Sequence, residues 1–278
     1  MHPILFQLGA ITVYTYGVLV AIGVILGLLY ARRQAFRAGL PPREIWNLGI
    51  YMIFGALAVS KLWLVFSAWR YFAANPSAIL SVTLLQSAGT FYGGVLGAVL
   101  VILVYSRVRK LPLLPVFDIA AGALPLAHAI GRLGCFAAGC CFGKPTTLPW
   151  GVTFTDHPAA RLAGTPLGIP LHPTQLYEAA AEFLNFLLLV WLGARRRFAG
   201  EILGTYFILY GIERGVIEIF RGDPGRGLMF HGSVSLMQIV SAGLVLAGCF
   251  LWWRGLRNAS ASSKTTVQSN QVAAHAAE

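Results

Sequence analysis

The sequence predicts an all-α polytopic membrane protein with about seven transmembrane helices. Of its 278 residues, 57% are hydrophobic and only 11% are charged, and the mean hydropathy is +0.69. A chain of this length and composition has too much apolar surface for a water-soluble globule. Its apolar residues gather in runs of about 20, the length at which a helix crosses roughly 30 Å of hydrocarbon. The runs lack the alternation of a membrane barrel, so all of them are predicted as helices.

Seven apolar runs have the length of a membrane span. In chain order they cover residues 11–30, 47–67, 90–106, 116–139, 174–193, 202–220 and 234–253. We expect residues 1–257 to form a single integral membrane domain, with a loop over about 143–172 that is too polar to span. Residues 258–278 are mostly Ser, Thr, Asn, Gln and Ala, a composition that predicts a disordered tail.

Basic residues orient these spans, because short cytoplasmic loops retain Lys and Arg. They follow every odd-numbered span: Arg32, Arg33, Arg37 and Arg43, then Arg107, Arg109 and Lys110, then Arg195, Arg196 and Arg197, and finally Arg254, Arg257 and Lys264. This predicts an external N-terminus and a cytoplasmic C-terminus. The net charge of +11 is explained by this sidedness and does not indicate a nucleic-acid partner. The first run is long and followed by arginines, so no cleavable signal peptide is predicted.

Two arginines fall inside predicted spans, where an Arg at a helix centre costs on the order of 2.5 to 3.5 kcal/mol. Arg132 lies late in the fourth span and Arg214 late in the sixth, and both spans run from inside to outside. The two guanidinium groups are therefore expected at a similar depth in the outer half of the membrane. Polar residues that open the spans running inward are expected at the same level: Tyr16, Tyr92, Gly93, Gly94, His172, Gln175, Tyr177 and Glu178.

The two arginines allow two interpretations. They could only hold helices together through buried ion pairs with Glu178, Glu213 or Glu218. Alternatively, two planar forks of donors at one depth suit a phosphate group, and the phosphate at that depth is a phospholipid headgroup. Glycines in "FYGGVLG" (91–97) and "GRLG" (131–134) would let a bulky ligand or another helix approach the backbone.

Several motifs, in order and over nearly the whole chain, resemble those of bacterial prolipoprotein diacylglyceryl transferases. They are "YGVL" at Tyr16, "FYGGVLG" at 91–97, "GRLGCFAAGCCFGKPT" at 131–146, "HPTQLYE" at 172–178 and "YGIERGVIEIFR" at 210–221. The resemblance implies an enzyme of the bacterial inner membrane with its active site toward the outer face. Such an enzyme moves the diacylglyceryl group of phosphatidylglycerol to the lipobox cysteine in the signal peptide of a preprolipoprotein and releases glycerol phosphate.

The resemblance also implies site residues. By the resemblance, Arg132, Arg214 and His172 are catalytic candidates; Tyr92 is a further candidate only through its own position at the opening of the third span. The residues expected to bind substrate are Tyr16, Gly93, Gly94, Gly134, Gly143, Gln175, Tyr177, Glu178, Tyr210 and Glu218. The chain departs from the family at three positions: many members have His at Tyr92, Asn at Cys135 and Glu at Cys140, so roles at those positions cannot be carried over.

The chemistry can be argued from the residues themselves. A substrate thiol with a pKa near 8.5 is mostly protonated at neutral pH, and a positive field raises its thiolate fraction. The thiolate attacks the glyceryl carbon, and negative charge grows on the departing phosphate, where Arg132 and Arg214 are expected to hold it. The proton acceptor is left open among Tyr92, His172 and the phosphate itself. No metal or other cofactor is required by this scheme.

Cys135, Cys140 and Cys141 have two interpretations. They fall near the oxidising face, where a Cys135–Cys140 disulfide is conceivable, but free buried thiols are the simpler expectation. The C-x4-C-C spacing is a weak match to a zinc site. Two other protein classes are alternatives: a lipid or small-molecule transporter, which would favour internal repeats, and a thiol-redox membrane protein, which would need a C-x-x-C pair.

Overall fold

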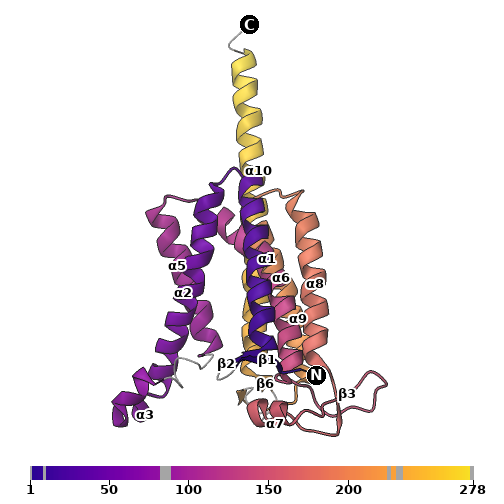
Figure 1. Cartoon of the computed structure of the whole chain (residues 1–278). Coiled ribbons are helices and arrows are strands. Elements are labelled where there is room, and N and C mark those ends of the chain that lie inside the picture. The colour runs from indigo at the N-terminus through magenta and orange to yellow at the C-terminus, as the bar shows by residue number, and fades with distance from the viewer. Residues whose placement is uncertain (1, 9–10, 82–88, 224–226, 230–233, 276–278) are drawn as a thin grey trace. The chain divides into compact units, whose positions relative to one another are not determined.

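The computed structural model describes residues 2–8, 11–81, 89–223, 227–229 and 234–275 (Figure 1). The chain forms two compact units. The first comprises Met1–Gly27 and Asp118–Glu278, and the second comprises Leu28–Phe117. The single domain expected over residues 1–257 stays a prediction.

Long helices dominate both units, as the all-α prediction requires. They are α1 (Thr15–Arg37), α2 (Pro42–Ser67), α5 (Phe91–Val108), α6 (Leu113–Ala138), α8 (Thr174–Gly193), α9 (Glu201–Phe220) and α10 (Leu236–His275). Shorter helices are α3 (Trp69–Ala74), the 3-10 helix η1 (Pro76–Leu80) and α7 (His157–Ala163). Each predicted span overlaps one of the long helices, with boundaries that differ by several residues.

Six of these helices are long and apolar enough to cross a membrane, and α9 is the long helix outside that set. It carries Glu201, Glu213, Arg214 and Glu218 within its 20 residues. It nevertheless has the length of a span and packs along both α8 and α10. The exact number of spans and the sidedness of the termini stay predictions.

The N-terminal boundary differs from the prediction. Residues Ile11–Tyr14 form strand β2, which pairs antiparallel with β1 (Ile4–Leu8), and α1 begins only at Thr15. The run "ITVYT" is rich in β-branched and aromatic residues, which favour a strand. Apolar composition alone could not distinguish this short strand from the first turn of a helix.

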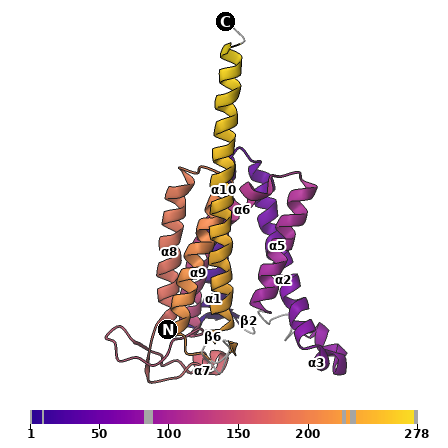
Figure 2. The same ribbon diagram turned by 180° about the vertical axis from the view of Figure 1, so that it is seen from behind.

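In the first unit, α9 packs closely against α10, and Figure 2 shows the two helices side by side. A β-carbon added at Gly248 of α10 would lie 2.5 Å from the carbonyl oxygen of Gly204 in α9, so glycine permits this approach. On another side of α9, Ile202 and Tyr206 join Leu189 of α8 in a buried apolar cluster. These contacts fix the rotation of α9, and with it the direction of its charged side chains.

Asp118 of α6 caps the start of α9. Its Oδ2 accepts a hydrogen bond from the Gly200 amide at 2.8 Å, and its Oδ1 accepts one from the Leu203 amide at 3.0 Å. These amides belong to the first turn of α9, whose N–H groups have no partner within the helix. Gly200 itself provides no side chain, so a residue from a neighbouring helix supplies the cap.

The segment predicted as a polar loop over 143–172 folds against the end of the first unit. Strand β3 (Val152–Thr153) pairs with β4 (Pro170–Leu171), and a second short pair joins β5 (Leu228–Met229) to β6 (Val234–Ser235). Phe142, Phe154 and Leu171 form a small buried core beneath the first pair. The segment is therefore a packed structure and not an extended connection.

In the second unit, α2 and α5 pack along one another. Gly93 opens α5 against α2: a β-carbon there would lie 2.8 Å from the Cα of Ser60 and from the Cβ of Trp63. The Ser60 hydroxyl also donates a 2.8 Å hydrogen bond to the Thr90 carbonyl. Within this unit, Gly93 therefore has a packing role.

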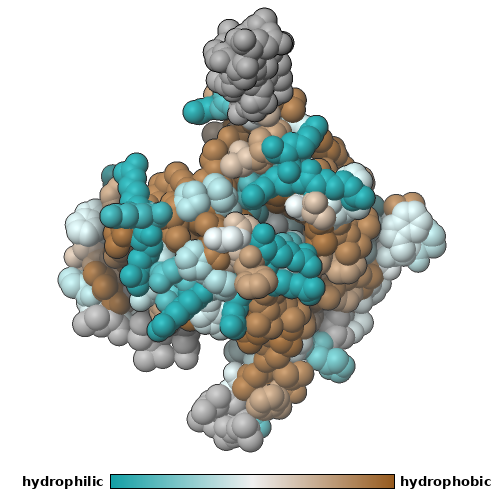
Figure 3. Space-filling model, turned by 90° about the horizontal axis from the view of Figure 1, so that it is seen from above, coloured by the Kyte–Doolittle hydropathy of each residue, from teal (hydrophilic) through white to brown (hydrophobic). Residues whose placement is uncertain are grey.

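Figure 3 views the structure from the side on which α10 projects, and hydrophilic side chains are visible among the apolar ones. In the first unit this side carries the basic connection between α8 and α9. The guanidinium of Arg195 lies 4.6 Å from the centre of the Trp191 ring, and that of Arg197 lies 4.8 Å from the Trp252 ring. Helix α10 continues past residue 257 without a break, so no structural boundary separates the predicted domain from the predicted tail. The disorder of residues 258–278 stays a prediction.

Candidate functional site

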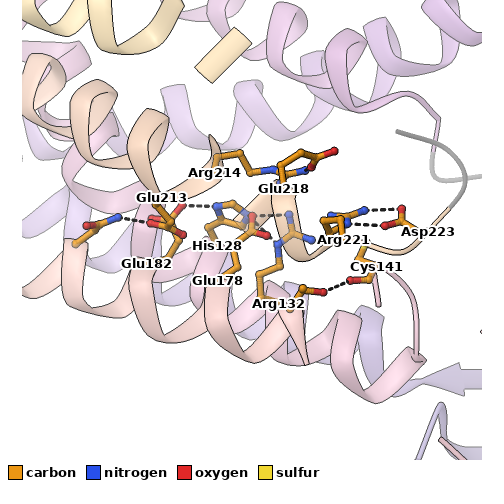
Figure 4. Close-up of polar contacts among 12 residues, drawn as sticks. His128, Arg132, Cys141, Glu178, Glu182, Glu213, Arg214, Glu218, Arg221 and Asp223 are labelled. Carbon is orange, nitrogen blue, oxygen red and sulfur yellow. Dashed lines mark hydrogen bonds and ion pairs between the residues drawn. The ribbon is translucent and has the colours of Figure 1, made fainter. Parts of the chain in front are cut away.

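Three helices of the first unit place pairs of polar residues one turn apart on facing surfaces. Helix α6 carries His128 and Arg132, and α8 carries Glu178 and Glu182. Residues at i and i+4 lie on the same face of a helix, so each pair points one way. Helix α9 adds Arg214 and Glu218 with the same spacing. Figure 4 shows these side chains gathered in one cluster.

His128 is held between the two carboxylates of α8. Its Nδ1 lies 2.5 Å from Glu182 Oε1, and its Nε2 lies 3.4 Å from Glu178 Oε1. The Tyr206 hydroxyl donates to the same Glu182 oxygen at 3.1 Å. Glu182 is fully buried, whereas the imidazole is 21% exposed. A buried carboxylate that orients a more accessible imidazole is the arrangement of a general base.

Arg132 bridges His128 and Glu178. Its Nη2 donates a 2.5 Å hydrogen bond to Glu178 Oε1, and its Nε donates to His128 Nε2 at 3.2 Å. With Arg132 Nε as the donor to Nε2, the proton of a neutral His128 ring lies on Nδ1, which faces Glu182. The side chain of Arg132 is 14% exposed, while that of Glu178 is 1% exposed.

Arg214 pairs with Glu218 on its own helix, with Nη2 lying 2.7 Å from Oε2. The contact is an ion pair without hydrogen-bond geometry, because neither Glu218 oxygen has a hydrogen-bond partner among the described residues. Within the same described part of the chain, Nη1 of Arg214 is also buried without a partner. Glu178 interacts electrostatically with both Arg132 and Arg214.

The buried ion pairs expected if the arginines are structural are thus present, between Arg132 and Glu178 and between Arg214 and Glu218. They do not satisfy every N–H group of the arginines. A buried N–H group without an acceptor is costly and uncommon in folded proteins. Arg214 Nη1 is such a group, and it lies beside the cluster that also contains Arg132. The Arg132–Glu178 pair therefore joins α6 to α8, whereas the Arg214–Glu218 pair lies within α9 and leaves one buried donor, Arg214 Nη1, without an acceptor among the described residues.

Three thiols lie next to Arg132. Cys135 follows it by one turn on α6, and the Sγ atoms of Cys135, Cys140 and Cys141 all lie within 4.8 Å of one another. No disulfide joins these cysteines, and all three are partly buried. Hydrogen bonds with the thiols of Cys135 and Cys140, followed by the positive charges of Arg221 and Arg132, lower the pKa of the Cys141 thiol.

The segment after α6 is tied to the segment before α8. The Gly143 amide donates to the His172 carbonyl at 3.0 Å, and the His172 amide donates to the Lys144 carbonyl at 3.0 Å. His172 Nδ1 lies 3.2 Å from the hydroxyl of Tyr177, which also accepts a 2.8 Å hydrogen bond from Trp150 Nε1. His172 therefore belongs to a contact network of its own, centred on Tyr177.

The other predicted residues are distributed as follows. Tyr16 packs on Gly134, where an added β-carbon would lie 3.2 Å from Tyr16 Cδ2. The ring of Tyr210 lies 5.8 Å from that of His128. Gln175 donates from Nε2 to the carbonyl of Cys140 at 2.7 Å, and its Oε1 is buried without a hydrogen-bond partner among the described residues, so its expected contact with substrate stays a prediction. Tyr92, Gly93 and Gly94 open α5 in the second unit, and their expected place beside the arginines stays a prediction.

The sequence reasoning missed His128 and Glu182. The sequence nevertheless contains a signal for them, because His128 lies four residues from Arg132 and Glu182 lies four residues from Glu178. Two polar pairs at helical spacing on apolar helices indicate a shared buried site. Asn185, which donates a 2.5 Å hydrogen bond to Glu213, extends the same cluster and was also missed.

Apolar helices of the first unit surround a buried cluster of Arg, Glu and His side chains, and a packed segment covers one end. This arrangement is typical of a polytopic membrane enzyme. The prolipoprotein diacylglyceryl transferase family matches residues 3–254, so the chain belongs to this family of membrane transferases.

Individual relatives extend over the same length. The chain is 31% identical over 255 residues to the phosphatidylglycerol–prolipoprotein diacylglyceryl transferase of Clostridium tetani, covering 91% of this chain and 97% of the relative. It is 32% identical over 265 residues to the enzyme of the same name from Solidesulfovibrio magneticus, covering 94% and 97%.

Proposed function

We propose that the chain transfers the diacylglyceryl group of phosphatidylglycerol to the lipobox cysteine of a preprolipoprotein signal peptide. Family membership and the names of the relatives support this activity. The observation that supports it best is the Nη1 of Arg214, which is buried and has no hydrogen-bond partner within the described part of the chain, in a cluster that also holds Arg132. A lipid phosphate supplies the acceptor that this donor lacks.

In this proposal Arg132 and Arg214 bind the phosphodiester and stabilise the charge that grows on it. The substrate sulfur attacks the glyceryl carbon that carries the phosphate ester. A carbon–sulfur bond forms, the carbon–oxygen bond breaks, and its electron pair leaves with the phosphate oxygen. Fixed donors aimed at such a developing charge contribute about 3 kcal/mol each in comparable roles.

His128 is the proton acceptor that the described residues favour. Its Nε2 lone pair accepts from Arg132 Nε in the structure. When Arg132 turns its donors to the lipid phosphate, that lone pair is released to accept the thiol proton. Glu182 then stabilises the imidazolium through the 2.5 Å contact with Nδ1. Phosphate binding and proton acceptance are therefore coupled through one guanidinium group.

Variants at the three candidate bases test this assignment. We expect His128→Gln to lower the rate of transfer by at least 10²-fold at neutral pH, the lower range for loss of a general base. The deficit should shrink as the pH rises, because solvent base then removes the thiol proton. His172→Gln and Tyr92→Phe serve as matched controls with smaller losses. Full activity of the His128 variant would exclude the imidazole as the proton acceptor.

We further place the active site toward the outer face of the bacterial inner membrane, with the signal peptide entering from the lipid. Arg195, Arg197 and Arg257 stack on Trp191, Trp252 and Trp253 at the basic end of the first unit. Tryptophan and arginine gather at membrane interfaces, and basic residues favour the cytoplasmic one. Labelling of single cysteines placed at positions 148 and 196 in intact cells would establish the sidedness.

Mass measurement tests the activity itself. Purified protein is incubated with phosphatidylglycerol and a lipobox peptide, and the peptide mass is then measured. The expected result is a gain of one diacylglyceryl unit, with no gain for a peptide in which the lipobox cysteine is replaced by serine. Transfer from phosphatidylethanolamine at the same rate would contradict the proposed donor, and no transfer from any phospholipid would contradict the activity.

A further inference from the structure

Three cysteines that are spread over seven residues of sequence converge in space. Cys135 lies in the last turn of α6, which ends at Ala138, and the chain then turns at Gly139, which has a φ of +80°. Cys141 also adopts a left-handed conformation, with a φ of +61°. Such a backbone is unfavourable for a residue with a side chain and persists only where its surroundings impose it. Together these turns bring the three sulfur atoms within 4.8 Å of one another.

Buried side chains hold this turn in place at three successive carbonyl groups. The Thr165 hydroxyl donates to the Gly139 carbonyl at 2.9 Å. The Gln175 amide and the Thr174 hydroxyl donate to the carbonyls of Cys140 and Cys141, each at 2.7 Å. All three donor residues are at most 3% exposed. The backbone that carries Cys140 and Cys141 is therefore fixed before any ligand binds.

We propose that the thiols of Cys135, Cys140 and Cys141 bind a Zn²⁺ ion whose fourth coordination position takes the substrate thiol. The proposal rests on the proposed function for the identity of that fourth ligand. Tetrahedral coordination with Zn–S bonds of about 2.3 Å places sulfur atoms roughly 3.8 Å apart. The sulfurs are within 4.8 Å, so closing on the ion requires each to move by less than about 1 Å, which side-chain rotation supplies.

The surrounding charge suits this ion. Three thiolates and Zn²⁺ carry a net charge of −1, and a fourth thiolate from the substrate makes it −2. Arg221 and Arg132 both interact electrostatically with Cys141 and balance that charge. Arg221 is itself positioned by two 2.5 Å contacts with Asp223, so its guanidinium is fixed beside the cluster.

The number of ligands also distinguishes the kind of site. Structural zinc sites are closed by four protein ligands, whereas catalytic sites keep one position open. The described residues supply three sulfur ligands here. Cys140 and Cys141 are partly exposed, so the open coordination position can be approached from outside the chain.

The chemical step follows from the known behaviour of coordinated thiols, which lose their proton on binding the metal. The substrate thiol binds Zn²⁺ as thiolate and its proton passes to His128. The bound sulfur attacks the glyceryl carbon, the new carbon–sulfur bond forms, and the carbon–oxygen bond to phosphate breaks with its electron pair. The thioether product is a poor zinc ligand and dissociates, and the phosphate product takes the proton back from His128.

Metal content of the intact protein tests the site without reference to activity. The full chain is purified in detergent with a tag that binds no metal, and zinc is measured per chain. We expect about one zinc in the wild-type protein and in Cys249→Ser, which changes an exposed cysteine on α10, and less than a tenth of that in C135S/C140S/C141S. Gln175→Ala, which loosens the turn, should weaken zinc affinity by 10- to 100-fold, as loss of a supporting contact does.

Cobalt substitution reports the ligands directly. Co²⁺ in the wild-type protein should show the intense sulfur-to-cobalt absorption and the visible bands of a tetrahedral thiolate site, and a lipobox peptide should increase the thiolate absorption. A peptide with serine in place of cysteine should not. Wild-type protein that transfers diacylglyceryl while holding no zinc, or with Cys135 and Cys140 joined as a disulfide, would overturn the inference and leave the proposed function intact. Zinc binding without any transfer would overturn the function instead.

Discussion

Replacing the Arg132–Glu178 pair separates the two interpretations of the buried arginine. In Arg132→Leu, Glu178 is left 1% exposed without its guanidinium. Removing one partner of a buried ion pair destabilises a protein by about 3 to 5 kcal/mol. His128 Nε2 lies 3.4 Å from the same carboxylate and can partly replace the lost charge, so we expect a value near the lower limit.

The double variant Arg132→Leu with Glu178→Leu should recover most of this stability, because buried pairs replaced by apolar residues of similar volume are near neutral or more stable. Its transfer activity should stay at least 10²-fold below wild type, the usual consequence of losing a donor to developing charge. Glu178→Leu alone is measured alongside, so that the carboxylate's own contribution can be subtracted.

Both properties are measured on detergent-purified protein, stability by unfolding in increasing denaturing detergent and activity by the peptide mass assay. Arg197→Leu is the matched control, because Arg197 also pairs with a buried glutamate, Glu201, at 2.8 Å but lies outside the proposed site. A double variant that regains both stability and wild-type transfer would refute the catalytic role and leave Arg132 as a structural residue.

Two further predictions concern the residues that position the site. Asp118→Ala should destabilise the protein by about 1 to 2 kcal/mol, because it removes the cap of α9, and Asp118→Asn, which keeps one acceptor oxygen, should lose less; unchanged thermal unfolding would contradict the capping role. Gly143→Ala should destabilise by about 1 to 3 kcal/mol and lower transfer, since the new β-carbon would lie 2.5 Å from His172 Cβ. Gly17→Ala, where nothing lies within 4 Å, is the control, and an equal effect of both changes would contradict the argument.

The hydrophobic runs predicted the long helices because lipid imposes a length and a composition that sequence shows directly. Boundaries were less accurate where another interaction competes. The β1–β2 hairpin takes residues 11–14 from the first predicted span, and α2 begins at Pro42, five residues earlier than predicted. A proline is favourable in the first turn of a helix, so α2 can begin at Pro42, before its apolar run starts.

The site was only partly predictable. Arg132, Arg214 and Glu178 were found because charges within apolar helices need an explanation. His128 was not predicted because a single histidine in an apolar helix does not reveal its contact with Glu182, which lies on another helix. The thiol cluster depended on backbone conformation at Gly139 and Cys141, which spacing alone does not determine. Contacts made by tertiary structure, such as Gln175 with the Cys140 carbonyl, have no signature in one sequence.

The polarity of α9 has a consequence for how the protein is made. A segment with four charged residues among 20 gains little by moving from the insertion machinery into lipid by itself. Its partners are the helices immediately before and after it, α8 and α10, which meet its apolar and glycine-lined sides. We therefore expect α9 to be retained at the translocon until α10 has been synthesised. Helices α8, α9 and α10 would then enter the bilayer together, already packed against one another.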